Sequence, residues 1–177
     1  MDEVLNLDNR RKIYGYIAKH PGTHLREMER ELEMPMGLLS YHLDYMVRRG
    51  ILKVEDDGYK KYYFPADLFH LKDRRTISIL RQEACRKMVI FILLHGPSTF
   101  QQLQGELKVS KSTLSYHLKR LISKDILMAT KRDRETLYSI EAEACIADLL
   151  IALRPSLQED AVDRFADIWS KMSEKES

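Results

Sequence analysis

Apolar residues recur with a helical period in three short stretches of the first fifty residues. Each stretch places its apolar side chains three or four positions apart: Ile13 and Ile17, then Leu25, Met28 and Leu32, then Leu39, Leu43 and Met46. Such spacing puts the apolar side chains on one face of a helix. Pro21-Gly22 follows the first stretch and predicts its end. The pattern therefore predicts three short amphipathic helices.

An extended pattern follows the third stretch. Ile51-Leu52 and residues 62–64 are rich in β-branched and aromatic residues, and Asp57-Gly58 lies between the two runs. An Asp-Gly pair between such runs predicts a β-hairpin. Two helices joined by a tight turn and followed by a hairpin form a winged helix-turn-helix.

The same pattern returns 75 residues later. The pentapeptide of residues 39–43, LSYHL, recurs at residues 114–118, and the offset holds without a gap over more than fifty residues. We therefore predict a mainly α-helical protein with small β-hairpin wings (α+β), built from two tandem copies of one domain. The predicted domains are residues 1–70 and 71–141, followed by a C-terminal helical tail at residues 142–177. In copy two the hairpin turn is expected over residues 131–134, where glycine is absent.

Polar residues stand where the predicted helices begin. Thr23 is expected to cap the second helix of copy one. In copy two, Ser98 is expected in that role, with Gln101 completing a capping box. Ser110 is expected to cap the third helix of copy two.

Beyond Ile140 the repeat stops, and the tail shows two further helical patterns. The first is expected to end near Pro155, and Ser156 is expected to cap the second. One side of this last helix carries an apolar stripe: Leu157, Ala161, Phe165, Ile168, Trp169 and Met172. Residues 88–94 are apolar on every face of their helix, so both surfaces need burial. Packing within the chain covers part of them, whereas a homodimer covers both, and we predict a homodimer.

The third helix of copy two, VSKSTLSYHLKRL at residues 109–121, resembles the recognition helix of ArsR-like and MarR-like winged-helix regulators. In those families a capping serine is followed by polar residues, by Ser-x-His-Leu and by a later leucine. The resemblance covers about residues 8–141, and the tandem arrangement is similar to that of archaeal regulators. It implies a sequence-specific transcription regulator that binds double-stranded DNA with this helix in the major groove.

The two copies differ in charge along this helix. Residues 110–124 carry four lysines or arginines and no acid, whereas residues 35–49 carry Arg48 and Arg49 against Asp44. Because phosphate neutralisation supplies most non-specific affinity, we expect copy two to bind DNA. The predicted contacts of its third helix and wing are Ser110, Lys111, Ser112, Thr113, Ser115, Tyr116, Lys119, Arg120, Lys131, Arg132 and Arg134. Copy one is expected to add weaker contacts through Ser40, Tyr41, Lys60 and Lys61.

Copy one also supports a different function. Its second helix is acidic, with Glu27, Glu29, Glu31 and Glu33, and its third begins with the apolar residues 35–38. These features favour a winged-helix adaptor that binds another protein, such as a component of the transcription machinery. RNA binding is a weaker alternative, because neither copy has aromatic platforms for splayed bases.

The remaining chemistry is sparse. The formal net charge is +2, so a DNA-binding surface must be a local patch. No phosphate-binding loop, nucleophile elbow or zinc-protease motif occurs, which argues against an enzyme. Pro21-Gly22 separates His20 from His24, so we expect no metal there, and we expect no cofactor. Cys85 and Cys145 are expected to be buried thiols of a cytoplasmic protein, dispensable for DNA binding.

Overall fold

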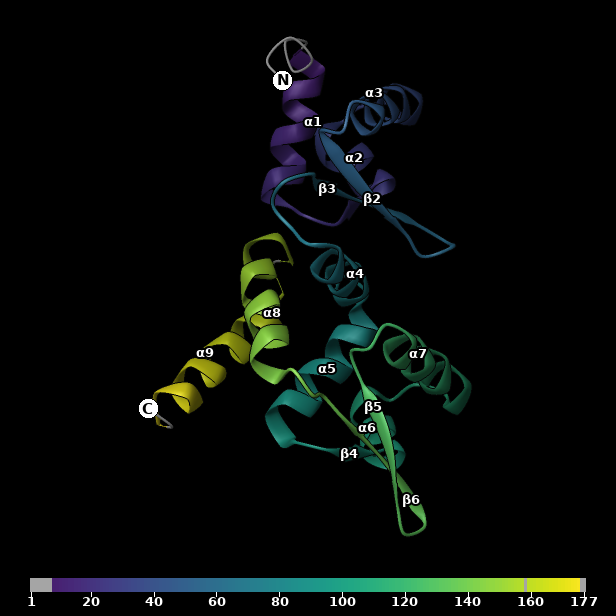
Figure 1. The fold of residues 1–177 in the computed structure, drawn as a ribbon, viewed down its shortest axis with the longest axis vertical. Coiled ribbons are helices and arrows are strands. Elements are labelled where there is room, and N and C mark those ends of the chain that lie inside the picture. The colour runs from purple at the N-terminus through teal and green to yellow at the C-terminus, as the bar shows by residue number, and fades with distance from the viewer. Residues whose placement is uncertain (1–7, 158, 176–177) are drawn as a thin grey trace. The chain divides into compact units, whose positions relative to one another are not determined.

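The computed structural model describes residues 8–157 and 159–175 (Figure 1). The chain divides into two compact units, unit 1 at Met1–Ser78 and unit 2 at Ile79–Ser177. Both units are mainly helical, and each contains one three-stranded antiparallel sheet. The predicted fold class, two copies of a helical domain with a small hairpin wing, is therefore confirmed.

Unit 1 combines three helices with a small sheet. Its elements are α1 (Asp8–Lys19), β1 (Thr23–His24), α2 (Leu25–Leu32), α3 (Met36–Arg48), β2 (Leu52–Asp56), β3 (Lys61–Pro65) and most of α4 (Leu71–Leu80). The strands lie in the order β1-β3-β2. Six of the predicted inward residues are fully buried: Ile13, Ile17, Met28, Leu39, Leu43 and Met46. The helical period of the sequence thus identifies the faces that form the core.

Unit 2 repeats this order and adds two helices. Its elements are α5 (Glu83–His95), β4 (Ser98–Thr99), α6 (Phe100–Leu107), α7 (Lys111–Ser123), β5 (Met128–Arg132), β6 (Glu135–Ser139), α8 (Glu143–Leu157) and α9 (Asp160–Lys175). The strands lie in the order β4-β6-β5. Figure 1 shows β5 and β6 as a hairpin that extends beyond the helices of its own unit.

The two sheets have the same register, shifted by 75 residues. Thr23 pairs with Tyr63, and Ser98 pairs with Tyr138. On the other side of each central strand, Val54 is opposite the first tyrosine and Ala129 is opposite the second. The internal repeat therefore extends to individual backbone pairs.

The wing of unit 2 turns more tightly than expected. The ladder continues to the pair Arg132–Glu135, which leaves Asp133 and Arg134 in the turn. Asp133 has a φ of +55°. The turn therefore lies within the expected stretch 131–134 but takes only its last two residues, and aspartate supplies the positive φ in place of glycine.

Both second helices begin one residue later than expected. Thr23 and Ser98 are strand residues with buried side chains, so neither caps a helix. The residues that follow them, His24 and Thr99, form the caps. Thr99 and Gln102 complete the capping box that was expected one residue earlier. The reason is the pairing of β1 and β4 with the central strands, which helical periodicity does not reveal.

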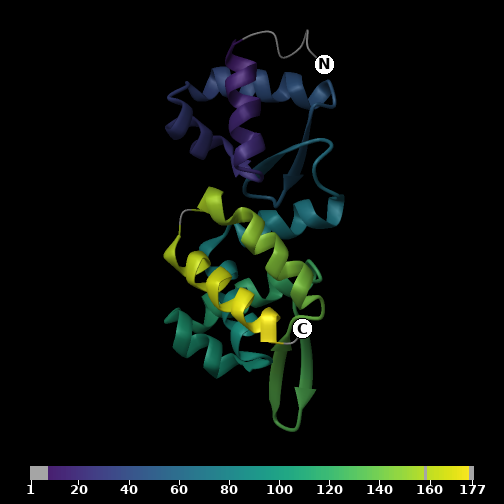
Figure 2. The same cartoon turned by 90° about the vertical axis from the view of Figure 1, so that its left-hand side faces the viewer.

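The tail forms two helices that pack within unit 2. α8 runs through Pro155 to Leu157, two residues past the proline near which its end was expected, and α9 begins at Asp160, so the expected cap at Ser156 is wrong. Pro155 lies in the last turn of α8, where its missing N–H removes a single hydrogen bond. Figure 2 shows α8 and α9 side by side, and α9 also packs on α5. The side chains that α9 buries are Val162, Phe165 and Ala166.

Candidate nucleic-acid interface

Helix α7 presents one face to the core of unit 2 and the opposite face to solvent. Leu114, Leu118 and Leu121 form the buried stripe, as predicted. Ser110 caps the helix, and its Oγ accepts a hydrogen bond from the amide of Thr113 at 3.1 Å, also as predicted. The cap and the stripe together fix which polar residues face outward.

Most of the predicted contact residues on α7 lie on its solvent face. Ser110, Lys111, Ser112, Thr113, Tyr116 and Lys119 are exposed, and Ser115 and Arg120 are half-buried. The Arg120 guanidinium folds onto its neighbour: Nη1 donates to the Tyr116 hydroxyl at 3.1 Å, and Cζ lies 5.6 Å from the ring centre. This contact holds a cation beside an aromatic hydroxyl on the helix surface.

The wing of unit 2 carries the remaining predicted cations. Lys131, Arg132 and Arg134 are all exposed. A hollow of about 480 Å³ lies between the wing and the helices, and its lining includes Lys111 of α7, Arg134 of the turn and Tyr138 of β6. The fold therefore brings the start of α7 and the tip of the wing to the same open space.

Behind the solvent face, α7 contacts α5 through a histidine and a thiol. His117 Nδ1 lies 3.5 Å from Cys85 Sγ. Burial, and then the charge of Arg120, lowers the pKa of His117. Burial raises the pKa of the Cys85 thiol to about 11, so the thiol stays protonated at neutral pH. His117 thus has the features of a structural histidine, with a lowered pKa and a contact to a buried thiol.

The second cysteine departs from the prediction. Cys145 on α8 is exposed, so the expectation of two buried thiols holds for Cys85 only. The inward face of α8 is formed by Ile146, Leu150 and Leu153, and Cys145 lies just outside that stripe. Throughout residues 8–157 and 159–175, no three His, Cys, Asp or Glu side chains gather in a way that suits a metal ion.

The equivalent helix of unit 1, α3, has a different solvent face. Pro35 precedes it, and no side chain caps it. Met36, Leu38 and Tyr41 are 37%, 38% and 61% exposed. The weaker predicted contacts divide between this helix and the wing: Ser40 is half-buried and Tyr41 exposed on α3, and Lys60 and Lys61 are exposed at the hairpin. This face thus offers apolar side chains, Met36 and Leu38, where α7 offers Lys111 and Thr113, whereas Tyr41 matches Tyr116.

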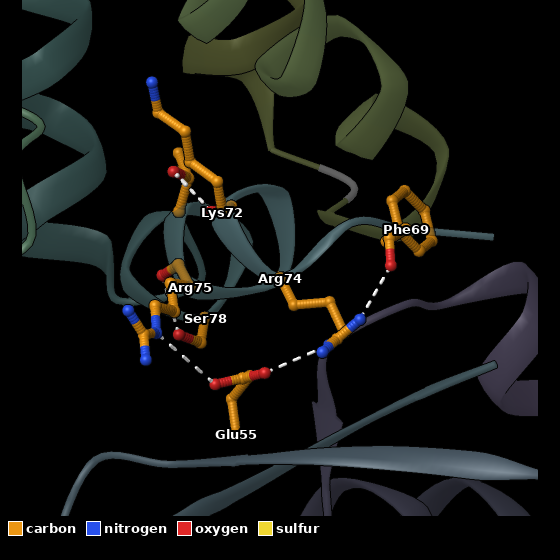
Figure 3. A network of polar contacts seen from close by, with 7 residues as sticks. Glu55, Phe69, Lys72, Arg74, Arg75 and Ser78 are labelled. Carbon is orange, nitrogen blue, oxygen red and sulfur yellow. Dashed lines mark hydrogen bonds and ion pairs between the residues drawn. The ribbon is translucent and has the colours of Figure 1, made fainter. Parts of the chain in front are cut away.

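A polar network joins the wing of unit 1 to α4, a helix that the sequence did not predict (Figure 3). Glu55 of β2 accepts a hydrogen bond from Arg74 Nε at 3.0 Å and lies 4.0 Å from Arg75 Nε. Arg74 Nη1 also donates to the carbonyl of Phe69 at 2.7 Å. The charge of Arg74 is therefore paired within unit 1 and adds little to a DNA-binding surface.

Comparison with known families agrees with this architecture. A family model described as an N-terminal HTH domain matches residues 7–77, and the model of the arsR family of bacterial regulatory proteins matches residues 85–127. The chain is 30% identical over 140 residues to an uncharacterized HTH-type transcriptional regulator, MJ1398, of Methanocaldococcus jannaschii. The match covers 78% of this chain and 35% of the relative, so the chain spans about a third of that protein's length.

Two solved structures show partial likeness. The transcriptional regulator Tm0710 from Thermotoga maritima shares 20% identity with a TM-score of 0.37, covering 60% of this chain and 73% of that one. The disulfide form of AbfR shares 14% identity with a TM-score of 0.40, covering 85% of this chain and 94% of that one. Neither superposition reaches a TM-score of 0.5, and the domain assignment follows from the family models.

Among the helices of the described residues, none combines the length and the apolar character that a membrane span requires. The chain is therefore a tandem helix-turn-helix protein, in which an N-terminal HTH domain is followed by a domain of the arsR family.

Proposed function

We propose that this chain is a transcription regulator that binds double-stranded DNA in a sequence-specific manner, and that unit 2 supplies most of the affinity. The observation that carries the proposal is the solvent face of α7, which combines cations with hydroxyl groups and has no acid over residues 110–124. DNA phosphates attract such a face, and lysine and serine side chains donate to acceptors on base edges.

The residues of unit 2 divide by role in this proposal. Lys111, Ser112 and Ser115, near the start of α7, face base edges in the major groove. Lys119 and Arg120, farther along the helix, neutralise phosphates. The exposed cations of the wing contact phosphates or a narrow minor groove. The hollow between wing and helix leaves room for the backbone that separates the two grooves.

Unit 1 is proposed to contact protein in preference to DNA. Its α3 exposes Met36 and Leu38 where α7 carries Lys111 and Thr113, and Asp44 lies at the position that Lys119 occupies on α7. A carboxylate at this position repels phosphate, whereas adjacent exposed apolar side chains favour a protein surface. A component of the transcription machinery is the class of partner that we propose.

We also propose a homodimer that forms through unit 2. Ile168 and Met172 of α9 remain 44% and 43% exposed, and Phe91 and Leu94 of α5 are only half-buried. A second copy covers these side chains. Sedimentation at tens of micromolar is expected to give the mass of a dimer, and Ile168→Asp with Met172→Asp is expected to give a monomer. A monomeric wild-type protein would refute the dimer.

DNA binding by unit 2 is tested by removing one exposed cation from the third helix of each unit. Lys119→Gln is expected to weaken binding to a fluorescent mixed-sequence duplex and to reduce the slope of log K against log salt by about 0.9. Arg48→Gln on α3 is the matched control and is expected to change neither quantity. Fluorescence anisotropy on the full chain, at about 50 to 200 mM KCl, measures both. Equal effects of the two variants, or no binding by the wild type, would contradict the proposal.

A further inference from the structure

The histidine of each repeated pentapeptide contacts the helix that precedes the helix-turn-helix of its unit. In unit 1, Arg10 Nε of α1 donates to His42 Nδ1 at 3.4 Å. In unit 2, Cys85 Sγ of α5 lies 3.5 Å from His117 Nδ1. Arg10 and Cys85 are 75 residues apart, as are the two histidines. This contact between the histidine Nδ1 and a side chain of the first helix, called the joint below, therefore occurs once in each unit, with a different partner residue on the first helix.

The two imidazole rings have the same orientation on their helices. Each stands edge-on to the preceding tyrosine, with ring centroids 5.2 Å apart. The interplanar angle is 67° for Tyr41 and His42 and 69° for Tyr116 and His117. In both units Nδ1 is the nitrogen that faces the first helix. The orientation of the ring is thus the same although the partner differs.

Arg10 fixes the position of the proton on His42. A guanidinium only donates hydrogen bonds, so Nδ1 of His42 accepts and the neutral ring carries its proton on Nε2. The Cys85 thiol is also a donor, because burial keeps it protonated. The thiol has two acceptors within reach, Gln82 Oε1 at 3.9 Å and His117 Nδ1 at 3.5 Å. With the S–H directed to the nearer one, His117 also carries its proton on Nε2.

The arginine next to this histidine lies on a different helix in the two units. In unit 1 it is Arg10, which is buried with its Cζ 3.7 Å from the centre of the Tyr45 ring. In unit 2 the position of Tyr45 is taken by Arg120, which bonds the Tyr116 hydroxyl on the surface of α7. The cation that unit 1 keeps inside is therefore placed, in unit 2, on the face proposed to meet DNA.

We propose that Cys85 is a positioning residue for DNA binding, which donates its S–H to His117 Nδ1 and holds the imidazole in the Nε2–H tautomer. The bond fixes the ring edge-on to Tyr116, whose hydroxyl accepts a hydrogen bond from Arg120, and ties α7 to α5. The inference rests on the proposed function of unit 2 for its effect on affinity, but the hydrogen bond itself is independent of DNA. It runs against the expectation from the sequence that Cys85 is dispensable, and the measurements below decide between the two.

Two substitutions separate the hydrogen bond from the volume of the side chain. Cys85→Ser keeps a donor, Cys85→Ala removes it, and Cys145→Ala is the control for loss of a thiol elsewhere. Long-range ¹H–¹⁵N NMR of the imidazole, on the full chain near pH 7.5, reports the tautomer of His117. The wild type, Cys85→Ser and the control are expected to show the Nε2–H form, whereas Cys85→Ala is expected to show a mixture.

Duplex binding by fluorescence anisotropy gives the second measurement. Cys85→Ala is expected to weaken binding about fivefold, the net effect of one hydrogen bond, and Cys85→Ser is expected to restore it. A double variant, Cys85→Arg with Arg120→Tyr, copies the joint of unit 1 and is expected to show the Nε2–H form. Unchanged tautomer and affinity in Cys85→Ala, or equal losses in the serine and alanine variants, overturn the proposal. If no protein binds the duplex, the proposed function fails, and the tautomer alone decides the hydrogen bond.

Discussion

Gly22 occupies a place in unit 1 that no side chain fits. Its φ is +76°, in the left-handed region, and its amide donates to the carbonyl of Tyr63 at 2.9 Å. A Cβ at this position would lie 3.0 Å from Ile77 Cγ2 and 3.1 Å from Phe64 Cζ. Both of these side chains are essentially fully buried, so neither has room to move away.

Gly22→Ala therefore combines two costs. An L-residue in the left-handed region costs about 1–2 kcal/mol, and overpacking a closed core costs about 1–3 kcal/mol. The free energy of unfolding of unit 1 is expected to fall by about 2–5 kcal/mol, the sum of the two. Gly50→Ala is the matched control, because Gly50 has a φ of +71° at the left-handed end of α3 but its Cβ would meet nothing within 4 Å. Only the first cost, about 1–2 kcal/mol, is expected there.

Urea unfolding of the full chain measures both variants. Far-UV circular dichroism follows the helices of both units, whereas fluorescence of Trp169, the single tryptophan, follows unit 2. Gly22→Ala is expected to move the dichroism transition to lower urea and to leave the Trp169 transition in place. Gly50→Ala is expected to move the dichroism transition by less than Gly22→Ala does. If Gly22→Ala costs no more than Gly50→Ala, the close contact with Phe64 does not exist.

Three further outcomes are expected. Replacing the three cations of residues 131–134 by glutamine should reduce the salt slope of duplex binding by about 2.7, measured by anisotropy, and an unchanged slope would exclude phosphate contacts by the wing. Burial lowers the pKa of His117, so the unfolded chain binds a proton before the folded chain does as the pH falls below about 6.5. The free energy of unfolding therefore keeps its full His117 contribution above that pH, decreases between it and the lower pKa of the folded state, and is constant below that pKa. His117→Gln should flatten this decline in urea titrations at about pH 7.5 and 5, and identical declines would contradict it. Glu159→Gln leaves the buried Arg86 without its carboxylate partner and should cost about 3 kcal/mol by urea unfolding, whereas a cost near zero would refute a stabilising pair.

The cores of both units were predictable because helical periodicity and the repeat act together. Leu114 and Leu118 follow the same spacing as Leu39 and Leu43, so each copy supports the assignment of the other. The strands β1 and β4 were missed because two residues carry no periodic pattern. Their assignment depends on the distant strand with which they pair.

Helix α4 was missed for a related reason. Its buried apolar residues gather in its last turn, at Ile77, Ile79 and Leu80, and do not form a stripe along the helix. The first half is held by the ion pair of Arg74 with Glu55, two residues that are distant in sequence. Packing and pairing across the fold therefore define this helix.

The candidate interface was predictable in its charge but not in its internal contacts. The lack of acids along α7 is a property of the sequence alone. The bond from Arg120 to Tyr116 and the approach of Cys85 to His117 depend on side-chain geometry, and the second joins residues that are 32 positions apart. Only the fold places these groups together.

The shared register of the two sheets makes a wrong partner available while the chain folds. In each unit a small hydroxyl residue is opposite a tyrosine, so β4 could form with Tyr63 of β3 the same pair that Ser98 forms with Tyr138 of β6. An exchange of β4 for β1 would give an entangled, domain-swapped product, a known hazard of repeated domains. Synthesis from the N-terminus favours the correct outcome, because β3 ends at Pro65 and is made before Ser98 emerges. When the full chain refolds from urea, all of its strands are present at once and that order is lost. We therefore expect refolding from urea to show a slow phase, which is absent when the first sheet closes during synthesis.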